Sequence, residues 1–169
     1  MTAGLQIIYN GAYQMRALLQ RVKRGGVRTT GHTEAIAAGL VVLLGVGEGD
    51  SEQDADFLAG KTANLRIFSN AEGKFDKSVL DVKGEALVIS QFTLYGDASA
   101  GRRPDFTKAA KPAEAERLYL YYVKALGALG VPVKTGVFGA EMEVEIINDG
   151  PVTLWLDSRR KRDTESRSV

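Results

Sequence analysis

The 169-residue sequence has no cysteine and only one histidine, His32. Without cysteine there is no disulfide framework, no thiol nucleophile and no thiolate ligand for a metal. One histidine excludes a His-rich metal cluster, and a Ser-His-Asp triad would have to use it. The string nearest to a G-x-S-x-G elbow, Gly96 to Gly101, has its first glycine one position too far from Ser99. We therefore expect chemistry with no metal and no cofactor.

Long apolar runs are also missing. The longest, Leu40 to Val46, is far shorter than the roughly 18–20 residues that cross a bilayer, so we expect no membrane association. Residues 1–14 lack the basic start and apolar stretch of a signal peptide. A cytoplasmic protein is the expectation that follows.

Charge of one sign is not in excess, because 22 Lys and Arg residues face 21 Asp and Glu residues. Bulk charge therefore does not indicate a nucleic-acid binder. The charge is unevenly distributed: residues 159–169 hold five basic residues, which leaves 17 basic and 19 acidic residues in 1–158. This basic tail could follow phosphates or could simply be a solvated arm.

The pattern of apolar residues predicts one α/β (α+β) domain with mixed or antiparallel sheets. Helices are expected over about 51–64, with Asp50 as N-cap, and from Pro112 to just before Gly130. The run 40–46 is apolar throughout, as a central strand covered on both faces would be. Strands are expected at residues 15–22, 40–46, 65–68, 86–92, 131–135, 142–147 and 152–156.

Two features that could form sites have simpler explanations. The glycines at 45, 47 and 49 resemble the start of a dinucleotide loop, but Asp50 occupies the place of the last glycine, and its carboxylate would repel a phosphate. A glycine turn into a capped helix is the preferred interpretation. Asp97 and Asp149 follow or flank strands, yet each can equally cap a turn.

Two polar strings stand out. Ser90-Gln91-Phe92-Thr93 follows an apolar strand, where sites are often built, although its hydroxyls could simply satisfy the local backbone. Asn148-Asp149-Gly150-Pro151-Val152-Thr153 is typical of a turn between two strands. A Gly-Pro bond is cis in about 5–6% of folded cases, and a cis bond would point consecutive carbonyls the same way.

Taken together and in this order, the motifs resemble the D-aminoacyl-tRNA deacylase family. The similarity runs from Met15 to Ser158, so residues 1–14 read as an N-terminal extension, 15–158 as the deacylase domain and 159–169 as a basic C-terminal tail. Gly25-Gly26 departs from the family pattern, which usually has Ala-Ser there. The matching strings are 15–22, 39–46, 64–68, 90–95, 101–104, 136–142, 148–153 and 156–158.

The resemblance implies a three-layer β/β/α domain that works as a homodimer, with each active site at the subunit interface. It implies hydrolysis of the ester in D-aminoacyl-tRNA, and of glycine mischarged on tRNA(Ala), with L-aminoacyl-tRNA rejected. The family's Gly-cisPro motif maps onto Gly150 and Pro151, which would enter the partner's pocket. Its other motif maps onto the catalytic positions Ser90, Gln91, Phe92 and Thr93.

Further positions follow from the same resemblance. Arg21 matches an arginine that braces the Gly-Pro motif, with a surface salt bridge as the simpler alternative. Substrate would contact Phe138, Ala140 and Met142, of which the last two could equally be core residues. Arg102 and Arg103 would meet phosphates of the tRNA acceptor end, or could be solvated loop residues.

The chemistry needs little from side chains, because an aminoacyl ester is already activated. The neighbouring ribose hydroxyl can assist water, and main-chain N–H groups near Gln91 and Phe92 can stabilise the oxyanion. A competing mechanism makes Thr93, or Ser90, a covalent nucleophile. Two rival functions stay open at this point: a non-catalytic RNA-binding module, and a metal-free hydrolase of small esters that uses Thr93.

Overall fold

The computed structural model describes residues 14–158, so the expected tail and nearly all of the expected N-terminal extension lie outside the described residues. Within that range no helix is long and apolar enough to cross a membrane. The elements, in chain order, are β1 (Arg16–Thr29), β2 (His32–Ile36), β3 (Gly39–Gly45), α1 (Glu52–Asn64), β4 (Phe68–Ser69), β5 (Phe75–Lys77), β6 (Glu85–Ser90), the 3-10 helix η1 (Phe92–Tyr95), α2 (Pro112–Ala128), β7 (Val133–Thr135) and β8 (Glu143–Asp157).

A mixed sheet forms the centre of the molecule. Its order is β2-β1-β3-β6-β7, and β8 pairs with β1. The pairs of β1 with β2, β3 and β8 are antiparallel, whereas β3 with β6 and β6 with β7 are parallel. The predicted mixed sheet is confirmed, and so is the central position of the apolar run in β3, whose residues are almost all buried.

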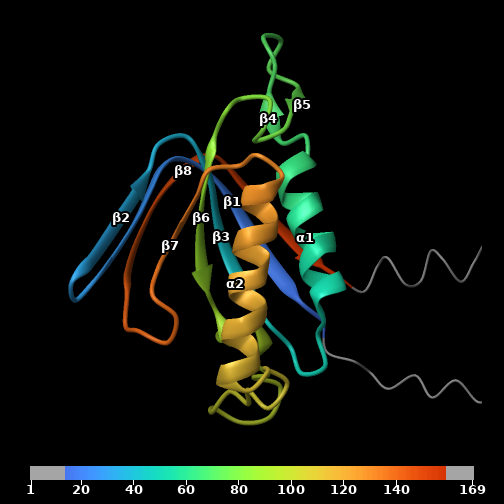
Figure 1. Ribbon diagram of the computed structural model, residues 1–169, viewed down its shortest axis with the longest axis vertical. Coiled ribbons are helices and arrows are strands. Elements are labelled where there is room, and N and C mark those ends of the chain that lie inside the picture. The colour runs from blue at the N-terminus through green and yellow to red at the C-terminus, as the bar shows by residue number, and fades with distance from the viewer. Residues whose placement is uncertain (1–13, 159–169) are drawn as a thin grey trace, which may run out of the picture.

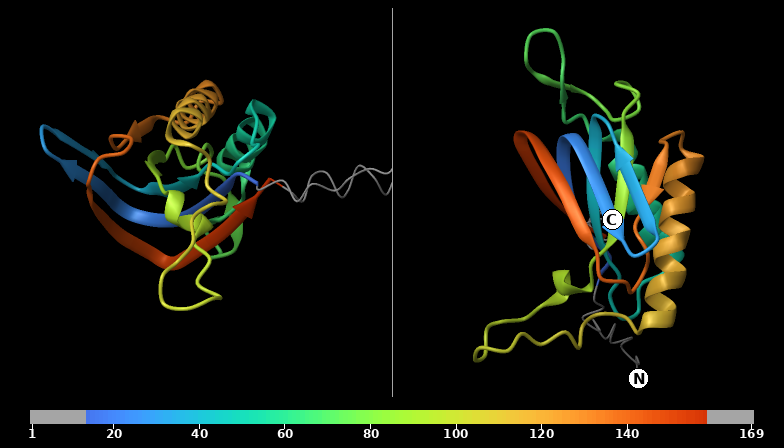
Figure 2. Two further views of the ribbon diagram at one scale, coloured as in Figure 1. Left: turned by 90° about the horizontal axis from the view of Figure 1, so that it is seen from below. Right: turned by 90° about the vertical axis from the view of Figure 1, so that its left-hand side faces the viewer.

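Three layers result because the sheet bends over itself (Figures 1 and 2). Both helices lie on one face of the sheet and enclose the larger core with residues such as Leu19, Val42 and Leu118. A second core lies between β1, β2 and β8 on one side and β3 and β6 on the other, and includes Val27 and Leu87. The β/β/α layering that the resemblance implied is therefore present.

The two helices are joined by a buried polar contact. The hydroxyls of Thr62 in α1 and Tyr122 in α2 lie 2.8 Å apart. Burial raises the pKa of Tyr122 well above its usual value, so this phenol stays protonated. Helix α1 begins after Ser51, one residue later than expected, because the Asp54 carboxylate accepts the Ser51 N–H at 2.9 Å. Asp50 instead closes the glycine turn by accepting the Gly47 N–H at 2.6 Å.

The largest correction concerns the predicted turn between two C-terminal strands. Residues 143–157 form one strand, β8, which pairs with β1 along its length. Gln20 pairs with Thr153 and Val22 with Asn148, so residues 149–152 oppose the single residue Arg21 and bulge from the ladder. The turn-forming residues therefore create a bulge, while the strand continues on both sides.

Other strands also begin or end at residues that differ from those predicted. The expected strand 15–22 continues to Thr29 and turns into β2, which the sequence did not predict. The departure at Gly25 has a physical reason in this hairpin, since a Cβ there would lie 2.7 Å from the Val41 side chain. The expected strand 86–92 ends at Ser90, and the expected strand 65–68 is the short β4 of a hairpin with β5.

Candidate active site

A cavity of about 500 Å³ opens where β6 ends. Its walls come from the ends of β3 and β6, from η1, from the loop before α2 and from the first turns of α2. Most of the lining is apolar, which suits a flat, weakly polar group better than a charged one. The lining includes Ser90, Gln91, Phe92, Phe106, Lys111, Tyr119 and Phe138.

Ser90, Gln91 and Phe92 line this cavity, whereas Thr93, the next residue, is not among its lining residues. Gln91 donates its N–H to the Leu44 carbonyl at 2.7 Å, so that N–H is already used. Phe92 and Thr93 are the first two residues of η1, where N–H groups have no acceptor within the helix. The side-chain amide of Gln91 donates to the Thr93 hydroxyl. The available donors are therefore those of Phe92 and Thr93.

Aromatic side chains form much of the wall. Phe92 is 58% exposed and meets Phe106 edge to face, with ring centroids 5.2 Å apart. Tyr119 and Phe138 lie 5.9 Å apart on the other side. Tyr119 donates to the Val88 carbonyl at 2.8 Å, and burial raises its pKa to about 12. The phenol is thus a fixed wall rather than an acid or base at neutral pH.

The loop of residues 96–111 borders the cavity and extends from the lower end of the molecule in Figure 1. Asp97 and Asp105 exchange main-chain hydrogen bonds of 2.8 and 2.9 Å. Hydrogen bonds from Ser99 hold the pKa of the Asp97 carboxyl below its usual range. This supports the turn-capping interpretation of Asp97. Arg102 and Arg103 lie exposed at the tip of the loop.

The bulge at Gly150-Pro151 lies elsewhere. The peptide bond between the two residues is cis. Its neighbour Arg21 pairs with Leu40 near the start of β3, whereas Ser90 pairs with Leu44 near the end. Four strand residues span about 13 Å, so one chain does not bring the two motifs together. They face opposite ends of β3.

Arg21 is buried, with 8% of its surface exposed, and it holds the bulge from behind. Its Nε donates to the Asp149 carbonyl at 3.0 Å and lies 3.4 Å from that residue's carboxylate. Its Nη1 donates to the Ile67 carbonyl at 2.7 Å. A Cβ added to Gly150 would lie 3.2 Å from its Nη2. Arg21 is therefore not the exposed salt bridge of the simpler alternative.

Of the three other residues expected to contact substrate, only one lines the cavity. Phe138 lines the cavity with Ser90, Gln91 and Phe92. Met142 packs against the second core, and Ala140 is not among the lining residues. Phe106, Lys111 and Tyr119 also line the cavity, but none of them belongs to a motif, so sequence reasoning missed them as site residues.

Residues 18–157 match the protein family described as D-Tyr-tRNA(Tyr) deacylase. A D-aminoacyl-tRNA deacylase of Geotalea uraniireducens (strain Rf4) is 51% identical over 155 residues, which cover 91% of this chain and 100% of that protein. One of Heliobacterium modesticaldum (strain ATCC 51547 / Ice1) is 58% identical over 146 residues, or 86% of this chain and 97% of that protein.

Two solved structures share the fold. One, described as the c-Myc DNA Unwinding Element Binding Protein, has 40% identity and a TM-score of 0.78 over 83% of this chain and 97% of its own. The other, described as a probable eukaryotic D-amino acid tRNA deacylase, has a TM-score of 0.75 over 85% of this chain and 99% of its own. Its 16% identity supports likeness of fold alone.

Arg21 and Arg24 provide a matched pair for testing the role of the buried guanidinium. Replacing Arg21 with Met keeps the apolar length but leaves the Asp149 and Ile67 carbonyls without their donor. We expect the free energy of unfolding, measured in urea, to fall by about 2–3 kcal/mol. Arg24→Met removes an exposed pair with Glu145 and should change it by less than about 0.5 kcal/mol. Equal losses in both variants would contradict this account of Arg21.

Proposed function

The chain belongs to the D-Tyr-tRNA(Tyr) deacylase family and hydrolyses the ester of D-aminoacyl-tRNA, and from this premise we propose that two subunits build each active site together. Ser90, Gln91, Phe92 and Thr93 of one subunit would hold the ester. Gly150 and Pro151 of the partner would enter the same pocket and reject L-aminoacyl-tRNA. The protein would act in chirality proofreading during translation, in the cytoplasm.

The observation that carries this proposal is the separation of the two motifs. They face opposite ends of β3 in one chain, so a site that needs both requires a second chain. A two-fold symmetric pair supplies each motif to the other's site at once, which is the simplest closed arrangement. The proposed pair is therefore a homodimer whose two sites are identical.

Stereochemistry explains what the bulge can do. D- and L-aminoacyl groups carry the same atoms, so only the direction of the side chain distinguishes them. If carbonyls of Gly150 and Pro151 fix the amino group, an L side chain is directed into the wall that they form. Glycine has no side chain to collide with the wall, so glycine mischarged on tRNA(Ala) would also be hydrolysed.

The cavity suits the end of the tRNA. Its apolar, aromatic lining would hold the terminal adenosine, with Phe138 available for stacking. The free N–H groups of Phe92 and Thr93 would stabilise the oxyanion that forms when water attacks the ester. Ala140 and Met142 would then support the pocket from outside the lining. Arg102 and Arg103 would meet acceptor-end phosphates from the exposed loop.

Thr93→Ala tests whether the hydroxyl is a nucleophile. In the proposed mechanism water attacks, helped by the ribose hydroxyl, so single-turnover hydrolysis of D-Tyr-tRNA should slow by less than about tenfold. Loss of a covalent nucleophile would instead slow it by roughly a thousandfold or more. That larger loss, together with an acyl-enzyme detected by mass spectrometry on the wild type, would contradict the proposal.

Trp155→Glu tests the need for a second subunit. Leu154 and Leu156 pack toward the helices, so Trp155 faces the other side of the sheet, where it is 49% exposed. A carboxylate there should weaken a dimer formed through this face. We expect sedimentation to show more monomer and specific activity to fall with dilution.

The matched control for Trp155→Glu is Leu120→Glu, on the outer surface of α2, where the leucine is 55% exposed. It should leave both the oligomeric state and the activity unchanged. A fully active monomer of the Trp155 variant would overturn the shared site.

A further inference from the structure

The hairpin of β4 and β5 reaches the bulge through Arg21, although the two are about 80 residues apart in sequence. Arg21 donates to the Ile67 carbonyl, immediately before β4, and to the Asp149 carbonyl, immediately before Gly150. One planar guanidinium therefore links the base of the hairpin to the bulge. The guanidinium is planar and rigid, so a shift of the Ile67 carbonyl changes where the Asp149 carbonyl can bind.

Aromatic rings of the same hairpin surround that guanidinium. The centre of the Arg21 guanidinium lies 6.0 Å from the Phe68 ring and 5.6 Å from the Phe75 ring. Phe68 is buried and belongs to the main core, but Phe75 is 57% exposed. Phe75 thus adds little to the core, and its defined contact is with Arg21. A ring in that place attracts the cation and limits its movement toward solvent.

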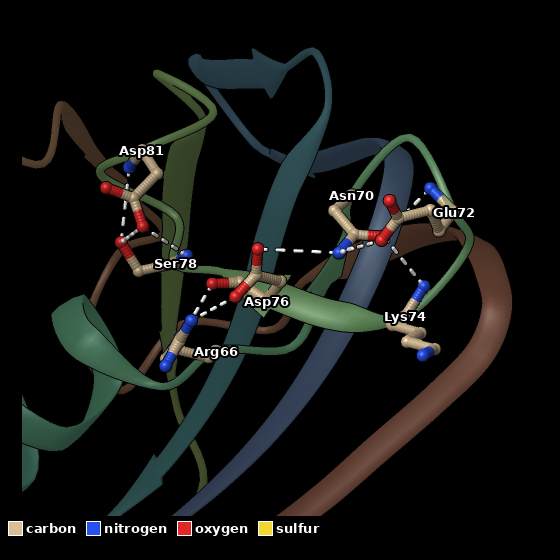
Figure 3. A network of polar contacts seen from close by, with 7 residues as sticks. All are labelled: Arg66, Asn70, Glu72, Lys74, Asp76, Ser78 and Asp81. Atoms are coloured by element: carbon tan, nitrogen blue, oxygen red, sulfur yellow. Dashed lines mark hydrogen bonds and ion pairs between the residues drawn. The ribbon is translucent and has the colours of Figure 1, made fainter.

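The hairpin holds its own shape through polar contacts (Figure 3). The Asn70 side-chain oxygen accepts the N–H groups of Glu72 and Lys74 at 2.9 and 3.0 Å. Arg66 donates to the Asp76 carbonyl at 2.7 Å and pairs with its carboxylate. These contacts connect the segments on either side of Phe75.

A second polar turn closes the exit from the hairpin. The Asp81 carboxylate accepts the N–H and the hydroxyl of Ser78, at 2.8 and 2.9 Å. These hydrogen bonds hold the pKa of the Asp81 carboxyl below its usual range, so it remains an acceptor at neutral pH. The segment 66–81 therefore forms a preshaped unit that presents Ile67 and Phe75 to Arg21.

We propose that the β4–β5 hairpin sets the stereoselectivity of the enzyme by positioning Arg21, with Phe75 as the positioning residue. This rests on the proposed function of Gly150 and Pro151 as the wall that rejects L substrates. The proposal gives the hairpin no contact of its own with substrate, because it acts through Arg21. The hairpin fixes the position of the Arg21 guanidinium, and the guanidinium fixes the position of the Asp149 carbonyl. The adjacent carbonyls of Gly150 and Pro151, which form the wall, are thereby positioned as well.

The test measures single-turnover rates for D-Tyr-tRNA and L-Tyr-tRNA and compares their ratio in Phe75→Ala and wild type. The ratio should fall by about two- to fivefold in Phe75→Ala, the change that loss of an exposed cation–π contact corresponds to. Phe75→Tyr keeps the ring and should restore the wild-type ratio. Leu120→Ala, at another exposed apolar position, should leave the ratio unchanged. General destabilisation would lower both rates together and leave the ratio constant.

A double-mutant cycle with Arg21→Lys tests the route. Lysine keeps the charge but cannot reach both carbonyls with one fixed fork. The single change should lower the ratio, and adding Phe75→Ala should lower it no further. Full additivity of the two changes would overturn the proposed route through Arg21.

The outcomes separate the two proposals. If the ratio of D to L rates is unchanged in Phe75→Ala, or falls equally in Phe75→Tyr, the proposed role of the hairpin is overturned. The proposed role of Gly150 and Pro151 still stands in that case, provided that the wild type is selective. If the lower ratio of Phe75→Ala returns to the wild-type value at higher protein concentration, the role of the hairpin is overturned too, because Phe75 would then act in subunit assembly. A wild type that hydrolyses both esters equally overturns the wall and, with it, the hairpin's role.

Discussion

The contact of Arg21 with two main-chain carbonyls holds the bulge of β8 in place. Four residues of β8 oppose Arg21 alone, and such a bulge has no ladder of its own to hold it. The buried guanidinium of Arg21 holds the bulge instead, because its Nε donates a hydrogen bond to the Asp149 carbonyl. Its Nη1 donates to the Ile67 carbonyl. The bulge at Gly150 and Pro151 is thus held by one side chain from β1, which makes its geometry sensitive to the surroundings of Arg21.

The arrangement of the sheet keeps the two sequence motifs apart within one chain. Parallel pairing of β3 and β6 places Ser90 beside the end of β3, whereas the bulge lies in the middle of β8, next to Arg21 and so near the start of β3. The cavity at Ser90 supplies apolar walls and main-chain donors but, among its described lining residues, neither a carboxylate nor a histidine. Such a site suits an ester that is already activated.

Much of this could be predicted from the sequence, and the failures have physical causes. Periodicity located β3 and both helices, because burial of one face fixes those patterns. The residues 148–151 are turn formers, yet pairing with β1 on both sides overrode the local preference and kept β8 continuous. The family resemblance pointed to Ser90, Gln91 and Phe138, which line one cavity, whereas Phe106, Tyr119 and Phe75 are brought into place by contacts between segments remote in sequence. Met142 follows a loop, where an apolar residue fits a pocket and a core equally well, and in the structure it packs against the second core.

The most direct test of the central claim is single-turnover hydrolysis of matched D-Tyr-, L-Tyr- and Gly-charged tRNA by the full-length protein, with and without EDTA. The account predicts rapid loss of the D-tyrosyl and glycyl esters, survival of the L-tyrosyl ester, and no effect of EDTA. Equal hydrolysis of the two tyrosyl esters would contradict it, because the wall at Gly150 and Pro151 would then not be selecting by stereochemistry.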